Sequence, residues 1–85
     1  MLEVKQRSIE VIEVADGFVF EIHEVQVEGE DVVEVWVYQK DYSTKIHAFS
    51  ILKESISNPA NLYKHIEENM QEYIDTYKEE VFEEQ

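Results

Sequence analysis

Three histidines, His23, His47 and His65, are the side chains in this sequence best suited to bind a transition metal. A shared site needs several such ligands around one ion. The predicted strand register places Trp36 between His23 and His47, which separates them by about two strand spacings, roughly 9 to 10 Å. His65 has an acid one turn further along a predicted helix, but a site there needs ligands from other helices. The sequence therefore predicts no metal site and no cofactor.

Catalytic motifs are also missing from the sequence. The chain has twenty Asp and Glu residues, so carboxylates that are close in sequence say little about general acid and base pairs. The two glycines, Gly17 and Gly29, are too far apart for a phosphate-binding loop, and no serine stands in a Gly-x-Ser-x-Gly motif. We therefore expect a protein that is not an enzyme.

Apolar alternation and turn signals predict four strands followed by one helix. The strands are expected near residues 2–15, 18–28, 32–39 and 44–52, and the helix near residues 59–82. Asn58 before Pro59 suits a helix start, because asparagine caps well and proline is tolerated in the first turn. The first strand changes phase midway, so we expect a bulge near residues 5–8. Residues 1–85 are thus predicted to form a single small α+β domain, a four-stranded antiparallel meander with one C-terminal helix packed on one face (ββββα).

The hairpin turns set which side chains share a face of the sheet. Asp16-Gly17 and Gly29-Glu30 fit two-residue turns of types I′ and II′. With these turns, one face is predicted to collect Ile9, Val11, Phe18, Phe20, Ile22, Val33, Val35, Val37, Ile46, Ala48, Ser50 and Leu52. The helix has an apolar seam formed by Leu62, Ile66, Met70, Tyr73, Tyr77 and Val81. We expect this seam to pack on that face.

The second face of the predicted sheet is also half apolar. Its apolar members include Val25, Val27, Val32, Trp36, Phe49 and Ile51. One interpretation is that a curled sheet shields these residues with its own long side chains. The other is a partner-binding surface, because soluble monomers rarely expose large apolar patches and a thin core gains stability from pairing. We favour the second interpretation, with a homodimer as the expected assembly and a different protein partner as the alternative.

The charge of the chain is strongly negative. Twenty acids against seven bases give a formal net charge of −13. The outer surface of the predicted helix carries six of the acids, Glu67, Glu68, Glu72, Asp75, Glu79 and Glu80. Such a surface repels phosphate groups, which disfavours direct binding to nucleic acids and to anionic membranes. This acidic surface is either simply solvated or binds a basic protein.

These features together predict a small acidic, non-catalytic protein-interaction module. The alternative is a phosphate mimic that occupies the groove of a DNA- or RNA-binding protein, as phage-type inhibitors do. The predicted topology also resembles the PC4 and Whirly architectures, which implies single-strand binding, although such binding needs a cationic groove with stacking aromatics. The absence of cysteine and of a long apolar run fits a cytoplasmic protein without a membrane span.

Overall fold

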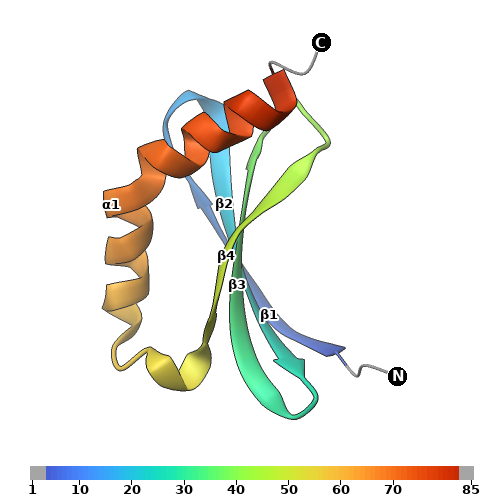
Figure 1. Cartoon of the computed structure of the whole chain (residues 1–85), viewed down its shortest axis with the longest axis vertical. Helices are drawn as coiled ribbons and strands as arrows, with labels where there is room; N and C mark the ends of the chain where they lie inside the picture. Colours follow the sequence, from blue (N-terminus) through green and yellow to red (C-terminus); the bar gives the residue numbers. More distant parts are fainter. Residues whose placement is uncertain (1–3, 83–85) are drawn as a thin grey trace.

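The computed structural model describes residues 4–82 as one antiparallel sheet and one long helix (Figure 1). The strands are β1 (Val4–Glu13), β2 (Phe18–Val27), β3 (Glu30–Gln39) and β4 (Lys45–Leu52), and helix α1 (Pro59–Tyr77) follows them. The strands lie in chain order, and each is antiparallel to the next. The predicted α+β fold class, ββββα, is confirmed.

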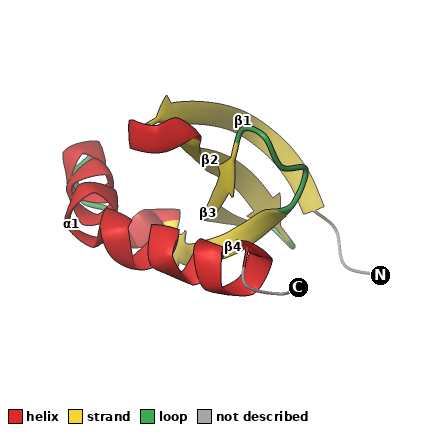
Figure 2. Ribbon diagram, turned by 90° about the horizontal axis from the view of Figure 1, so that it is seen from above, coloured by secondary structure: helices red, strands yellow, loops and turns green. Residues whose placement is uncertain are grey.

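The helix covers one side of a curved sheet (Figure 2). We name the face that α1 covers the inner face and the opposite one the outer face. The buried core lies between α1 and the inner face and consists of Phe18, Phe20, Ile22, Val33, Val35, Val37, Ile66, Ile74 and Tyr77. All six sheet residues of this core were predicted to face the helix.

The turn between β2 and β3 differs from the prediction by one position. Glu28–Gly29 is the two-residue turn, and both residues have positive φ, 49° and 85°, as a type I′ turn requires. The predicted turn, Gly29-Glu30, is therefore wrong. The register changes by two residues, so Ile22 pairs with Val35 and not with Val37. A change of two leaves every side chain on its predicted face.

The turn between β1 and β2 differs from the prediction in its length, and this difference changes the face on which side chains of β1 lie. It contains three residues, Ala15–Gly17, and not the predicted two-residue turn Asp16-Gly17. As a result Glu10, and not Val11, pairs with Ile22. This change of one residue moves each side chain of the neighbouring part of β1 to the opposite face.

The prediction that Ile9 and Val11 face the helix is therefore wrong. Both lie on the outer face, where they are 55% and 57% exposed. Ile12 takes their place and packs against the core. The register of β1 also breaks between Gln6 and Ser8, which confirms the predicted bulge near residues 5–8.

Strand β4 contains a bulge that the sequence analysis did not predict. Trp36 pairs with His47 as expected, but the next pair joins Val35 to Phe49. Ala48 is thus an extra residue on β4. A bulge of this kind reverses the faces of all the residues that follow it.

Because of the bulge, four residues lie on the face opposite to the one predicted for them. Phe49 and Ile51 were predicted on the second face, but both pack against the core on the inner face. The ring of Phe49 stacks on Tyr73 of α1, with centroids 5.5 Å apart and planes 24° apart. Ser50 and Leu52, predicted to face the helix, lie on the outer face. Packing of two large side chains against the helix accounts for the bulge.

Helix α1 begins as predicted. The side chain of Asn58 accepts a hydrogen bond from the backbone N–H of Ala60, 2.9 Å away, and Pro59 follows it. Ile66 and Tyr77 of the predicted seam are buried, together with Ile74. The other four seam residues pack on the core while partly exposed.

A π-helical turn, Lys78–Phe82, extends α1 at its C-terminal end. This turn brings Phe82 into an aromatic cluster with Phe18, Tyr42 and Tyr77. The ring centroids of these three residues lie 6.3, 4.7 and 5.7 Å from that of Phe82. The cluster holds the end of the helix against the sheet, although several acids near it oppose the helix dipole.

Alanine substitutions along α1 measure how tightly the helix packs. Ile66→Ala is expected to reduce the free energy of unfolding by about 2 to 4 kcal/mol, because Ile66 is only 3% exposed. Met70→Ala should cost less, because Met70 is only partly buried. Glu72→Ala, on the exposed side, should change stability by less than about 0.5 kcal/mol. Equal losses at all three positions in urea unfolding contradict helix packing on the inner face.

Candidate functional site

The outer face is the surface of the sheet that no other element of residues 4–82 covers. Its side chains from residue 9 onward are Ile9, Val11, Glu13, Val19, Glu21, His23, Val25, Val27, Glu30, Val32, Glu34, Trp36, Tyr38, Lys45, His47, Ser50 and Leu52. They include apolar, aromatic, acidic and basic groups. This mixture distinguishes the outer face from the strongly acidic surface of the helix.

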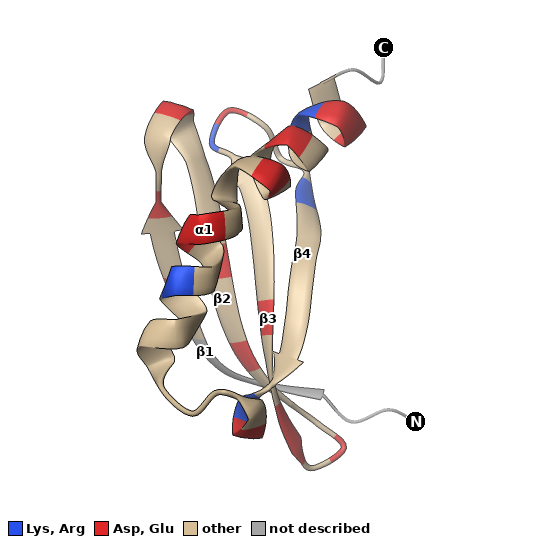
Figure 3. Cartoon of the chain, turned by 60° about the vertical axis from the view of Figure 1, so that its left-hand side comes forward, with Lys and Arg blue, Asp and Glu red and all other residues tan. Residues whose placement is uncertain are grey.

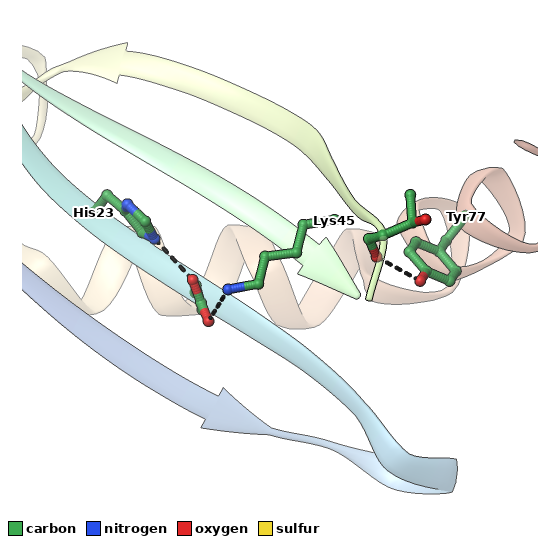
Figure 4. A network of polar contacts seen from close by, with 5 residues as sticks. His23, Lys45 and Tyr77 are labelled. Carbon is green, nitrogen blue, oxygen red and sulfur yellow. Dashed lines mark hydrogen bonds and ion pairs between the residues drawn. The ribbon is translucent and has the colours of Figure 1, made fainter. Parts of the chain in front are cut away.

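A buried carboxylate lies near the centre of the outer face. Glu21 is 8% exposed. Nζ of Lys45 donates to its Oε2 at 3.0 Å, and Nε2 of His23 donates to its Oε1 at 2.8 Å (Figure 4). Because an ionised carboxylate only accepts hydrogen bonds, this geometry places a proton on Nε2 of His23. The charge of Glu21 is therefore compensated within the face.

These contacts change the acidity of Glu21. Burial by itself raises the pKa of this carboxyl group. Hydrogen bonds from His23, Lys45 and Tyr38, together with the Lys45 charge, outweigh burial and hold the pKa below its ordinary value of 4.5. Glu21 therefore stays ionised and paired at neutral pH.

The lowered pKa of Glu21 predicts a pH-dependent contribution to stability. A carboxyl group whose pKa is lower in the folded chain stabilises the fold above its unfolded pKa, and this stabilisation is lost as pH falls through the folded pKa. Glu21→Gln should therefore be less stable than the wild type at pH 7, with a difference that shrinks below pH 4.5. Urea unfolding at several pH values measures it, with Glu72→Gln as the control for loss of one charge. A difference that stays constant into the acid range contradicts the role of the carboxylate.

Trp36 pairs with His47 as predicted, but its partner on β2 is Glu21 and not His23, so the predicted pairing with His23 is wrong. Its ring still lies near both imidazole rings. Its ring centroid is 6.4 Å from that of His23 and 5.1 Å from that of His47. The indole Nε1 is buried and has no hydrogen-bond partner among the described residues. His47 interacts with the hydroxyl of Ser50 at 2.6 Å. The indole ring of Trp36 thus lies near the centre of the outer face, between the two imidazole rings.

The six predicted partner-binding residues fall into three groups. Val25 is buried, only 4% exposed, in the middle of the sheet. Val27, Val32 and Trp36 are half-buried on the outer face. The remaining two, Phe49 and Ile51, lie on the inner face as described above. Only the second group can offer apolar surface to a partner in this conformation.

Three further apolar residues of the outer face were not predicted there. Ile9 and Val11 of β1 and Leu52 of β4 are exposed. The signal that could have identified Ile9 and Val11 is the choice between a two-residue and a three-residue turn around Gly17, because that choice decides their face. We define the apolar patch as the accessible apolar residues of the outer face: Ile9, Val11, Val27, Val32, Trp36 and Leu52.

The sheet itself covers part of the outer face. Val19 is 2% exposed and Val25 is 4% exposed, although α1 lies on the other side. Their burial agrees with the interpretation that a curled sheet shields residues of its central strands. The apolar residues that are more than one-third exposed lie on the two edge strands, β1 and β4. The shielding is therefore incomplete at the two edges. Glu21 and His23 of β2 separate Ile9 and Val11 on β1 from the apolar residues of β3 and β4, so the apolar patch has two parts.

The acidic surface of the helix is separate from this patch. All six of its residues, Glu67, Glu68, Glu72, Asp75, Glu79 and Glu80, are exposed. Figure 3 shows acidic residues along the middle and the C-terminal part of α1. Because α1 covers the inner face, the acidic surface and the apolar patch lie on opposite sides of the molecule. A partner on one side leaves the other side free.

Comparisons with other proteins give no relative from which a function could be transferred. No protein-family model, no curated protein sequence and no solved structure matches the chain. Within residues 4–82, no helix is long and apolar enough to cross a membrane. In the same part of the chain, no group of three or more His, Asp or Glu side chains is arranged to hold a metal ion. Function must therefore be inferred from the surfaces of this chain.

Proposed function

We propose that this protein is a small, non-catalytic protein-interaction module that forms a homodimer through its outer face. The observation that carries the proposal is the apolar patch on a face that the helix does not cover. Trp36 is central to this patch, and tryptophan is one of the residue types that contribute most to protein interfaces. Ile9, Val11 and Leu52 extend it to both edges of the sheet.

Electrostatics favour the outer face for contact between two identical chains. Each chain carries a net charge of −13, so most of its surface repels a second copy. On the outer face, Lys45 pairs with Glu21, and Lys40 in the turn after β3 pairs with Glu13 at the edge of this face. Two copies that meet through this face keep their acidic helix surfaces far apart. Self-association here has a lower electrostatic cost than association through α1.

The area of the outer face sets the size of the proposed interface. Its strands contain eight to ten residues. At about 3.3 Å per residue and about 4.8 Å between strands, four such strands have a projected area of roughly 600 Å². The curled sheet already buries Val19, Glu21 and Val25, so the accessible part of this face does not reach the roughly 800 Å² per partner of a standard interface. Two copies related by a two-fold axis would meet through the exposed residues near the two edges of the sheet.

A double substitution on β1 tests this proposal with little risk to the fold. Ile9→Ser with Val11→Ser removes apolar side chains that are more than half exposed in one chain. Their loss from a buried interface should raise the dimer dissociation constant about tenfold or more. The thermal stability of the monomer should hardly change. Sedimentation velocity measures the dissociation constant, and Tyr63→Ser, an exposed apolar residue on α1, is the control.

Two outcomes of this experiment contradict the proposal. One is an unchanged dissociation constant in the double variant. The other is an equal increase in the Tyr63→Ser control, which means that the effect is not specific to the outer face. A wild-type chain that stays monomeric removes the homodimer and leaves a different protein as the partner of the patch.

We also propose that the acidic surface of α1 binds a second partner. A dimer formed through the outer faces leaves two copies of this surface exposed on opposite sides. Its charge suits a basic protein, and the alternative function is a phosphate mimic in the groove of a nucleic-acid-binding protein. Competition separates the two, because added DNA should displace this chain from a nucleic-acid-binding groove but not from an unrelated basic surface. The double variant Glu68→Gln with Glu72→Gln, which removes two charges from this surface, is the control for charge-dependent binding.

A further inference from the structure

A cavity of about 240 Å³ lies between the first turns of α1 and the inner face of the sheet. Its lining contains both apolar and polar side chains. The apolar members are Ile22, Val33, Ile56, Pro59 and Leu62, and the polar members are Glu10, Glu24, Lys53 and Tyr63. Apolar walls with a few polar groups are typical of small-molecule sites.

The cavity exists because α1 packs unevenly along its length. Ile66, Ile74 and Tyr77, from the middle and end of the helix, are buried. Near the helix start, Leu62 is only partly buried and Tyr63 is 39% exposed. Figure 1 shows the first half of α1 standing beside the strands, while its second half crosses the sheet. Apolar surface of the core is therefore left without a packing partner at the helix start.

The polar residues of the cavity form two pairs. The hydroxyl of Tyr63 donates to Oε1 of Glu10 at 2.6 Å. Lys53 forms an ion pair with Glu24. An ionised carboxylate can accept about four hydrogen bonds, so Glu10 can accept more than the one from Tyr63. Among the side chains that the structure describes, two carboxylates and one ammonium group give the lining a net negative charge.

The start of the helix offers little to an anion. Backbone N–H groups at a helix N-terminus often bind anions. Here Pro59 has no N–H, and those of Ala60 and Asn61 donate to the side chain and the backbone carbonyl of Asn58, both at 2.9 Å. Lys53 is held by Glu24. Both the lining charge and the net charge of −13 therefore favour a cation.

We propose that this cavity binds a small primary amine with a compact apolar body. The apolar body contacts Ile22, Val33 and Leu62, and the ammonium group donates to the carboxylate of Glu10. A cavity of 240 Å³ is smaller than those that hold drug-sized ligands, so the ligand is small. The site lies on the inner face, so the proposal does not depend on dimer formation.

Three probes of the same shape test the proposal: benzylamine, benzyl alcohol and benzoate. Each is titrated into the full ¹⁵N-labelled chain at pH 7 and followed by amide chemical shifts. Benzylamine should give saturable shifts at Ile22, Val33 and Leu62, with a dissociation constant on the order of 1 mM for a ligand of this size. Benzoate should bind at least about tenfold more weakly, because its charge meets Glu10. Equal binding of all three probes, or no saturable shift with benzylamine, overturns the proposal.

Substitution of Glu10 identifies the group that selects the amine. Glu10→Gln should weaken benzylamine binding about three- to tenfold and leave benzyl alcohol unaffected. Glu79→Gln is the matched control, because it removes one charge from an exposed position at the far end of the helix. Glu10→Asp, which keeps the carboxylate, should retain part of the preference for the amine. If Glu10→Gln and Glu79→Gln weaken benzylamine binding equally, the effect comes from net charge and no amine site exists.

Discussion

Replacing Tyr77 with alanine is expected to lower the free energy of unfolding by about 3 to 5 kcal/mol, as for other buried aromatic rings. The side chain of Tyr77 is fully buried. Its ring meets Phe18 and Phe82 edge to face, with centroids 5.9 and 5.7 Å apart. Its hydroxyl donates to the backbone carbonyl of Thr44 at 2.6 Å (Figure 4). Tyr77 thus joins the helix end, the sheet and the loop before β4.

A second substitution separates the ring from its hydroxyl. Tyr77→Phe keeps the aromatic contacts but leaves the carbonyl of Thr44 without this partner, so it should cost about 1 to 2 kcal/mol. Tyr63→Ala, at a tyrosine on the same helix that is 39% exposed and donates to Glu10, is the control for loss of a ring that packs less closely. Urea unfolding measures all three variants. If Tyr77→Ala costs no more than Tyr63→Ala, the C-terminal half of α1 does not pack as described.

Trp36→Ser is expected to convert the dimer into a monomer at micromolar concentrations. Removal of a central aromatic residue from an interface commonly costs about 2 kcal/mol or more, which raises the dissociation constant roughly 30-fold. Trp36 is suited to this role because it is half-buried between His23 and His47 in the middle of the outer face. Sedimentation velocity measures the change in mass.

The effect of Trp36→Ser must be separated from a loss of folding. The circular dichroism spectrum of the variant should keep the strand and helix signals of the wild type. Leu52→Ser, at an exposed position on the opposite edge of the outer face from β1, should also weaken the dimer. A folded Trp36→Ser variant that remains a dimer contradicts the proposed interface. A wild-type monomer that loses a different protein partner on this substitution supports a heterologous contact instead.

The order of elements could be predicted from the sequence because local signals determine it. Asn58 and Pro59 start the helix, and Gly17 and Gly29 mark the first two turns. The exact turn length could not be predicted, because Ala15–Gly17 supports both a two-residue and a three-residue connection. The difference of one residue moved Ile9 from the inner to the outer face.

The composition of the outer face could be predicted only in part. The segment Lys45–Leu52 was assigned a single alternation, which places Phe49 and Ile51 beside His47, although its apolar residues change phase between Ala48 and Phe49. In the structure, contact of Phe49 with Tyr73 prevails over regular pairing, and Ala48 bulges. The phase change between Ala48 and Phe49 is the signal that could have predicted this bulge, as the phase change in β1 did for the first strand. The position of Trp36 did not change, because the bulge lies beyond its pair with His47.

Sedimentation equilibrium of the wild-type chain over a range of protein and salt concentrations tests the homodimer most directly. We predict a species of twice the 10.1 kDa chain mass. Its dissociation constant should fall as salt rises, because salt screens the repulsion between two chains of charge −13 over distances of about 10 Å at 0.1 M. A single species of 10.1 kDa at every protein and salt concentration would contradict the homodimer.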